Sequence, residues 1–118
     1  MKLSILTATY NRASYLQKLY DSIKKNLKYN LNCEWVIVDD GSTDDTKIQV
    51  EKFINENKVH IIYCYQKNSG KMEAINQAVK LSSGNLMVDC DSDDYFVENA
   101  FDIIEKNANK LAENQKLY

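Results

Sequence analysis

The stretch EWVIVDDGSTDDT, residues 34–46, contains a complete change from one type of secondary structure to another. Its first half is an apolar, β-branched run of strand length that ends in Asp39 and Asp40. A glycine closes the run, and Ser42 or Thr43 is suited to cap a following helix. The stretch therefore predicts a buried strand, a polar turn and a helix, which together form one β–α unit.

The same pattern extends outward in both directions along the chain. Further strands are expected at residues 2–9, 59–65 and 85–91, beside the one at 34–40, and helices at 13–28, after residue 43, at 71–81 and around 101–111. Apolar residues three and four apart predict the buried face of each helix. The expected inward residues are Leu16, Leu19, Ile23 and Leu27; Ile48 or Val50 with Phe53 and Ile54; Met72, Ile75 and Val79, with Ala78 as a further candidate; and Phe101, Ile104, Ala108 and Leu111.

Alternating strands and helices favour a parallel sheet, because parallel strands need crossover connections, and these place helices over the sheet. The predicted fold class is α/β: a three-layer α/β/α sandwich with a mostly parallel, Rossmann-like sheet. The 118 residues suit a single domain spanning residues 1–118. Right-handed crossovers bring the carboxyl ends of the strands to one edge, where such sheets bind ligands.

Composition excludes some classes of protein. Hydrophobic residues make up 44% and charged residues 27%, and the formal net charge of −2 gives no reason to expect a nucleic-acid partner. Cys33, Cys64 and Cys90 fit no metal-binding spacing and are expected to be buried thiols in a reducing compartment. The opening apolar run is too short for a signal peptide. We expect a cytoplasmic chain, and a peripheral position at the inner face of the membrane stays open.

Polar residues gather where the predicted strands end. They are Thr9, Tyr10 and Asn11; Asp39 and Asp40; and Asp91, Ser92, Asp93 and Asp94. A purely structural interpretation makes residues 39–46 a turn with a capped helix, and makes Asn11 or Ser14 the cap of the first helix. A functional interpretation gives an aromatic ring that stacks on a nucleobase and carboxylates that accept hydrogen bonds from a base or ribose. The two interpretations stay open at this point.

The stretch VDCDSDDY, residues 88–95, crowds four carboxylates into six positions. Two carboxylates about 5 Å apart repel by roughly 3 kcal/mol at an effective dielectric constant near 20, so a compensating cation is expected, although a solvated acidic turn is the common alternative. Asp91 and Asp93 form a DxD pair of hard oxygen ligands, which suit Mg²⁺ or Mn²⁺. Near them, Lys71 and the start of its helix are suited to face phosphate groups.

Four segments in chain order, SILTATYNR, EWVIVDDGSTDDT, NSGKMEAINQAV and GNLMVDCDSDDY, together resemble the family 2 glycosyltransferases of the GT-A fold. The resemblance covers nearly the whole chain. It implies that this chain is the donor-binding part of an inverting transferase, which moves a sugar from a nucleotide-diphospho-sugar, with UDP expected, to a saccharide or lipid-linked acceptor in surface polysaccharide synthesis. The alternative is a binding module or truncated remnant without turnover. A response-regulator-like domain is disfavoured, because its acidic pair would follow the first strand.

The resemblance also implies roles for single residues. Thr9 and Tyr10 would line the pocket for base and ribose, Asp40 would recognise the base, and Asp39 would support the rim of the pocket. Lys71 would lie near the donor. Asp93 would bind a divalent metal, Mn²⁺ or Mg²⁺, and Asp91 would contact ribose or metal, while Asp94 could cap the last helix. Asp89 departs from the family pattern, being either exposed or part of the acidic site. The catalytic base is expected beyond Tyr118, His60 is expected to be structural, and the face left by a missing acceptor half would favour self-association.

Overall fold

The alternation of strands and helices is confirmed in the computed structural model, which describes residues 2–27 and 32–115, with side chains as far as Lys110. The elements are β1 (Lys2–Thr9), α1 (Ala13–Asn26), β2 (Asn32–Asp39), α2 (Thr46–Glu56), β3 (His60–Tyr65), α3 (Lys71–Leu81), β4 (Leu86–Asp89) and α4 (Ala100–Gln115). Residue 28 of the first predicted helix and the side chain of Leu111 lie outside the described part. No helix within that part is both long and apolar enough to cross a membrane.

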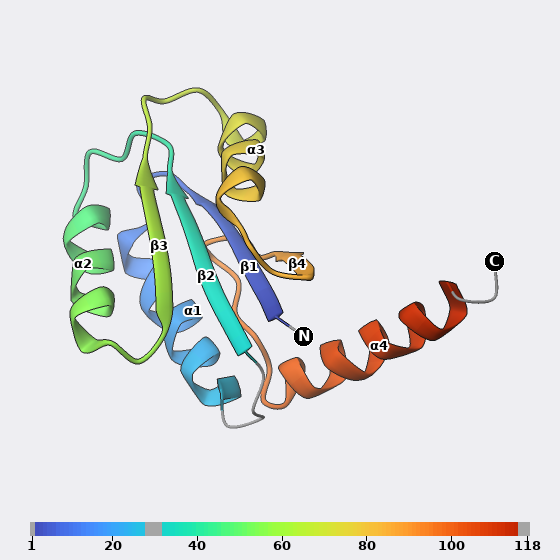
Figure 1. Ribbon diagram of the computed structural model, residues 1–118. Helices are drawn as coiled ribbons and strands as arrows, with labels where there is room; N and C mark the ends of the chain where they lie inside the picture. Colours follow the sequence, from blue (N-terminus) through green and yellow to red (C-terminus); the bar gives the residue numbers. More distant parts are fainter. Residues whose placement is uncertain (1, 28–31, 116–118) are drawn as a thin grey trace.

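The four strands form one parallel sheet in the order β3-β2-β1-β4 (Figure 1). β1 lies inside the sheet and pairs with β2 along its whole length, so that Thr9 stands opposite Asp39. On its other side β1 pairs with β4, where Leu6 stands opposite Asp89. Helices cover both faces, and the predicted three-layer α/β/α architecture is confirmed.

The larger core lies between the sheet and the helices α1 and α2. Side chains of β1 and β2 that point to this face meet Leu16, Leu19 and Ile23 of α1, as the helical spacing predicts. Trp35 of β2 is fully buried and stacks with Phe53 and Tyr20 of the two helices, at ring-centroid distances of 6.1 and 6.3 Å. Such aromatic contacts add to the burial of apolar area and fix how the helices lie on the sheet.

The opposite face of the sheet is covered by α3, and here the predicted inward residues are partly wrong. Ala74 and Ala78 are the buried residues of α3, whereas Met72 and Val79 are exposed and Ile75 is half-buried. The small alanine side chains let the helix approach closely to the β-branched residues of the strands beneath it. The larger side chains then fall on the outer face of the helix.

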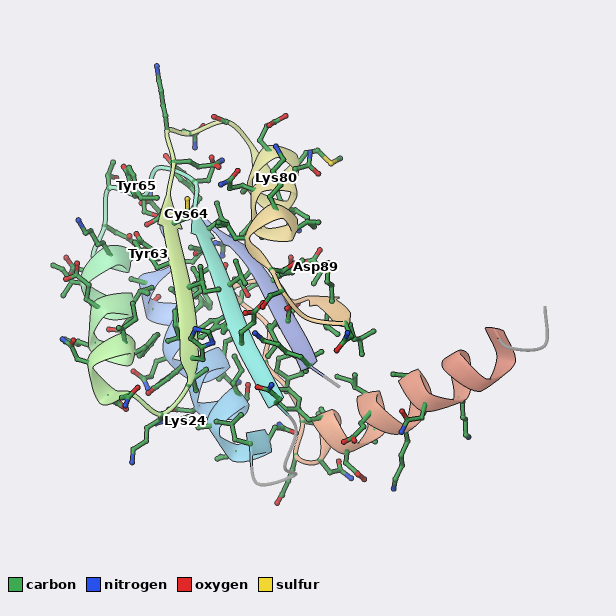
Figure 2. All side chains as sticks on the ribbon, viewed as in Figure 1. Lys24, Tyr63, Cys64, Tyr65, Lys80 and Asp89 are labelled. Carbon is green, nitrogen blue, oxygen red and sulfur yellow. The ribbon has the colours of Figure 1, made fainter. Side chains whose placement is uncertain are left out.

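One more predicted burial is wrong, and one strand is shorter than predicted. In α2, Val50 and Phe53 are buried as expected, but Ile54 is exposed. β4 is the shorter strand and forms an edge of the sheet, so that its residues alternate between half-buried and exposed. Asp89 is therefore exposed on this edge strand (Figure 2), and its charge needs no buried partner.

A buried carboxylate joins the strands at the amino end of the sheet, far from the ligand edge. Glu34 of β2 is fully buried and accepts hydrogen bonds from Ser4 Oγ at 2.6 Å and from Ser83 N at 2.7 Å. Lys2 Nζ lies 3.2 Å from its Oε1. Burial opposes ionisation of this group, but the hydrogen bonds outweigh that effect and lower the pKa of Glu34 to about 2. A Cβ at Gly84 would lie 2.4 Å from Ser4 Oγ, so the turn before β4 closes tightly onto this group.

We expect Glu34→Gln to lower the free energy of unfolding at neutral pH by roughly 3 kcal/mol, the scale that follows from the lowered pKa. A lowered folded-state pKa stabilises above the unfolded-state value near 4.5, and this stabilisation is lost as pH falls towards 2. The acid-induced loss of stability between these values should therefore shrink in the variant. Urea denaturation across this pH range measures it, with exposed Glu51→Gln as control. An equal acid-induced loss of stability in the wild type and both variants would show that ionised Glu34 does not stabilise the fold.

Candidate functional site

A cleft of about 430 Å³ opens at the carboxyl edge of the sheet, where β1 lies between β2 and β4. This is the point where the strand order reverses, which is where open α/β sheets bind ligands. The residues that line it are Ala8, Thr9, Tyr10, Arg12, Asp40, Asn68, Gly70, Lys71, Asp91, Ser92 and Asp93. Segments from four separate parts of the sequence therefore meet in one cavity.

Six of the seven residues to which the family resemblance assigns donor or metal contacts line this cleft: Thr9, Tyr10, Asp40, Lys71, Asp91 and Asp93. The seventh, Asp39, is buried and does not line it. Asp39 is fully buried and accepts hydrogen bonds from Tyr63 Oη at 2.6 Å and from Ser42 N at 2.9 Å. Tyr63 stands near the carboxyl end of β3 (Figure 2). Asp39 thus connects the end of β2 with the turn that follows it and with β3.

Thr9 and Tyr10 form the end of β1 in the cleft wall. Thr9 is only 3% exposed, and its Oγ1 atom has no hydrogen-bond partner within the described part of the chain. An unpaired buried hydroxyl costs free energy, and a ligand group that forms a hydrogen bond with it would remove this cost. Tyr10 is 48% exposed, so one side of its ring is accessible.

Asp40 holds the loop that leads into α3. Its carboxylate accepts hydrogen bonds from Gln66 Nε2 at 2.9 Å, Ser69 N at 2.7 Å and Gly70 N at 2.9 Å. Burial opposes ionisation, but these hydrogen bonds outweigh it and hold the pKa of Asp40 below its ordinary value. The carboxylate is therefore ionised at neutral pH, and Lys71 directly follows the loop that it holds.

Gly41 allows this loop to approach. It has φ +87°, a conformation that L side chains rarely adopt, and a Cβ there would lie 2.8 Å from the backbone nitrogen of Asn68. Asn68 Nδ2 also donates to the carbonyl oxygen of Asp40 at 3.0 Å. The absence of a side chain at Gly41 therefore lets the loop that contains Asn68 pack against the turn after β2.

The predicted helix caps are wrong, because one residue of the loop before α2, Asp44, caps both α1 and α2. Asp44 accepts from Ala13 N at the start of α1, at 3.2 Å, and from Thr46 N at the start of α2, at 3.0 Å. Asn11, with φ 51°, accepts from Thr43 N at 2.8 Å, and its own N–H donates to Ser42 Oγ. Both loops are thereby fixed beside the cleft.

The carboxylates at the other side of the cleft form a cluster. One oxygen from each of Asp91, Asp93 and Asp94 lies within 4.8 Å of the others. Asp94 is in this group and not at α4, which begins at Ala100. Such hard oxygen donors fit a divalent cation of the Mg²⁺ or Mn²⁺ type.

The ammonium group of Lys71 faces the cluster. Lys71 Nζ lies 2.7 Å from Asp91 Oδ1, and this hydrogen bond raises the pKa of Lys71 above its ordinary value. Both side chains are about half exposed or more, so the pair contributes little to stability. Its significance is that it places positive charge beside the carboxylates.

Neither the thiols nor the histidine supplies a reactive group to the cleft. Burial, with the carboxylates nearby, raises the pKa of the Cys90 thiol to about 12, so that it stays protonated at neutral pH. Cys33 is also buried, as expected, while Cys64 is only half-buried. His60 is exposed at the amino end of β3, the end of the sheet opposite the cleft.

Sequence reasoning did not select four residues of the cleft wall, Ala8, Arg12, Asn68 and Gly70. Ala8, Arg12 and Gly70 directly flank residues that were selected, so closeness in sequence was the available signal. Asn68 carries no such signal, because it reaches the cleft only through the contact of its loop with the end of β2.

The sequence profile described as "Glycosyl transferase family 2" matches residues 4–115, and the chain belongs to this family. An uncharacterised glycosyltransferase of Mycoplasma genitalium is 37% identical over 113 residues, which cover 93% of this chain and 38% of that protein. The poly(ribitol-phosphate) β-N-acetylglucosaminyltransferase TarS of Staphylococcus aureus is 35% identical over 95 residues, which cover 80% of this chain and 17% of TarS. The chain thus spans well under half of these relatives.

The structural comparison agrees. The crystal structure of S. aureus TarS 1–349 is similar with a TM-score of 0.83 at 32% identity, covering 93% of this chain and 33% of that one. The same TarS fragment in complex with UDP-GlcNAc gives a TM-score of 0.80 at 32% identity. A mannosyltransferase from Pyrobaculum calidifontis, 24% identical, shares the fold with a TM-score of 0.73. The predicted GT-A fold is confirmed.

We expect Asp40→Asn to loosen the loop of residues 66–70. One amide oxygen cannot accept all the hydrogen bonds that two carboxylate oxygens accept, so the free energy of unfolding should fall by about 1–3 kcal/mol. Amide hydrogen exchange at Ser69 and Gly70 should accelerate. The exposed Asp45→Asn, in the neighbouring loop, is the control and should leave both amides as in the wild type. Unchanged exchange at these amides in Asp40→Asn would refute the role of the carboxylate.

Proposed function

We propose that the cleft binds a nucleotide-diphospho-sugar, with uracil as the base, and that the chain is the donor-binding part of a glycosyltransferase. The observation that carries the proposal is the buried hydroxyl of Thr9, which lacks a partner among the described residues and lines the same cavity as a lysine and a carboxylate pair. The cavity thus offers a polar partner for a nucleoside and charged partners for a diphosphate.

The relatives support this choice of ligand. TarS 1–349, 32% identical to the chain, has been solved with UDP-GlcNAc, which favours a UDP-sugar here. Because the chain covers only 32% of that protein, transfer and the identities of sugar and acceptor are part of the proposal.

The base and ribose would be held by β1 and β2. The exposed ring of Tyr10 offers a face on which a base stacks. Thr9 Oγ1 offers a hydrogen bond to the nucleoside. The Asp40 carboxylate oxygens accept from three donors within the described part of the chain and have room for one more, so that a base N–H can be accepted in addition.

The diphosphate would lie between α3 and the acidic cluster. Lys71 Nζ supplies positive charge at this place, and the start of α3 adds the favourable end of its dipole. Asp93 would hold a divalent cation, and Asp91 would contact the cation or the ribose. When bound, such a cation would neutralise the carboxylates and stabilise the charge of the leaving nucleoside diphosphate.

Transfer requires two further components. Inverting attack by an acceptor hydroxyl needs a general base, for which we assign no residue of the cleft. The acceptor would be a saccharide or a lipid-linked saccharide of a surface polysaccharide, and a lipid-linked acceptor would bring the domain to the inner face of the membrane. Self-association through the face next to the cleft belongs to the same proposal.

Calorimetric titration with UDP and UDP-GlcNAc, with and without Mn²⁺, tests this function. We expect Mn²⁺ to tighten UDP binding to the wild-type chain. In Asp93→Ala, the affinity measured with Mn²⁺ should fall at least about tenfold, or about 1.4 kcal/mol, because the cation loses a ligand. The affinity without Mn²⁺ should change little.

Asp102→Ala is the matched control, since it removes a half-buried carboxylate that lies outside the cleft and pairs with Lys106 on α4. It should bind UDP like the wild type. Absence of UDP binding by the folded wild-type chain, with or without Mn²⁺, would reject the donor site. A product assay with the full-length protein then separates a transferase from a binding module without turnover.

A further inference from the structure

One stripe of α1 carries three polar residues at intervals of four, Lys18, Ser22 and Asn26. Residues four apart lie on the same side of a helix. The chain that follows the acidic cluster, residues 95–101, makes contact with all three. We call Lys18, Ser22 and Asn26 the α1 stripe.

The first two residues of the α1 stripe, Lys18 and Ser22, contact the residues that follow the acidic cluster. Lys18 Nζ lies 4.0 Å from the centre of the Tyr95 ring, within the range of a cation–π interaction. Ser22 Oγ accepts a hydrogen bond from Phe96 N at 3.0 Å and donates one to Leu19 O at 2.7 Å. Tyr95 directly follows Asp94 of the acidic cluster.

The last residue of the stripe, Asn26, binds the backbone at the start of α4. Asn26 is fully buried, and its Nδ2 donates to Val97 O at 3.1 Å. Its Oδ1 accepts from Phe101 N at 3.0 Å, in the first turn of α4. The Phe101 ring packs against Phe96 with centroids 5.1 Å apart. Both ends of the segment are thus attached to one helix.

Stability of α1 alone does not account for these residues. Its other buried positions, such as Leu16, Leu19 and Ile23, are mainly apolar, and serine and asparagine are poor helix formers. Residues 95–99 belong to no helix or strand, so their backbone groups need partners from elsewhere. Ser22 and Asn26 supply such partners.

We propose that the α1 stripe is a positioning device for the acidic cluster. The turn that carries the carboxylates is closed by a hydrogen bond from Asp94 N to Asp91 O at 3.0 Å, and it is anchored on one side by β4 and on the other by the stripe. Ser22 and Asn26 are therefore positioning residues that act through residues 91–97. The consequence for cation binding rests on the proposed function, whereas the anchoring itself does not.

The test uses Ser22→Ala, which removes the acceptor for Phe96 N, and Lys18→Gln, which removes the cation over Tyr95. Lys18→Arg restores that cation. Lys25→Gln is the matched control, because it removes one charge from an exposed position of the same helix. Glu34→Gln serves as a second control that weakens the fold at the opposite end of the sheet.

The first measurement is amide hydrogen exchange without added metal. Ser22→Ala should accelerate exchange at Phe96 and Asp94 at least threefold, while amides of α2 keep wild-type rates. Lys18→Gln should accelerate exchange at the Asp94 amide, and Lys18→Arg should restore the wild-type rate there. A wild-type exchange rate at Asp94 in both Ser22→Ala and Lys18→Gln would overturn the proposal. An acceleration at Asp94 in Glu34→Gln as large as in Ser22→Ala would also overturn it.

The second measurement is Mn²⁺ affinity, from electron paramagnetic resonance of the free ion. Ser22→Ala and Lys18→Gln should weaken binding at least threefold, with Lys18→Arg, Lys25→Gln and Glu34→Gln close to the wild type. Wild-type affinity in both stripe variants would overturn the link to the cation. A folded wild-type chain that binds no Mn²⁺ would instead reject the metal site of the proposed function, and the exchange rates would still decide on the anchoring.

Discussion

Every part of the cleft depends on the parallel pairing of β1 with a strand on each side. The pairing with β2 puts Thr9 opposite Asp39 and lets Asp40 N donate to Thr9 O at 2.8 Å. On the other side Cys90 N donates to Leu6 O at 2.9 Å, which ends β4 just before the carboxylates begin. Since all strands run in one direction, each polar loop leaves the sheet at the same edge. A change in the register of β1 would separate the groups that now share one cavity.

The carboxylates of the chain fall into two physical groups. Glu34, Asp39 and Asp40 are buried, and each accepts hydrogen bonds that fix loops or strands. Asp91 and Asp93, at the cleft, are more exposed and have fewer partners within the described part. The first group makes the frame rigid, so that the second can stay close together in spite of its mutual repulsion.

Local pattern was sufficient to predict the elements, the layers and most of the cleft wall. Strand runs and helical spacing depend on neighbours in sequence, and the carboxyl edge of a parallel sheet then brings the selected residues together. The errors depend on which distant segments contact one another and which do not, and local pattern does not contain this information. Ala74 and Ala78 face the sheet because α3 approaches it closely, and β4 is half-exposed because no described strand follows it in the sheet. Asp44 caps two helices because two loops meet.

Trp35 is the single tryptophan of the chain and lies in the core with no exposed surface. Its Nε1 donates to Thr7 Oγ1 at 2.9 Å, and that hydroxyl donates to Cys90 O, also at 2.9 Å, one residue before the acidic cluster. The protein therefore contains an intrinsic fluorophore that is shielded from aqueous quenchers but is connected to the cleft through a chain of two hydrogen bonds. Changes in its emission in the folded state report on the backbone at the end of β4, without any label.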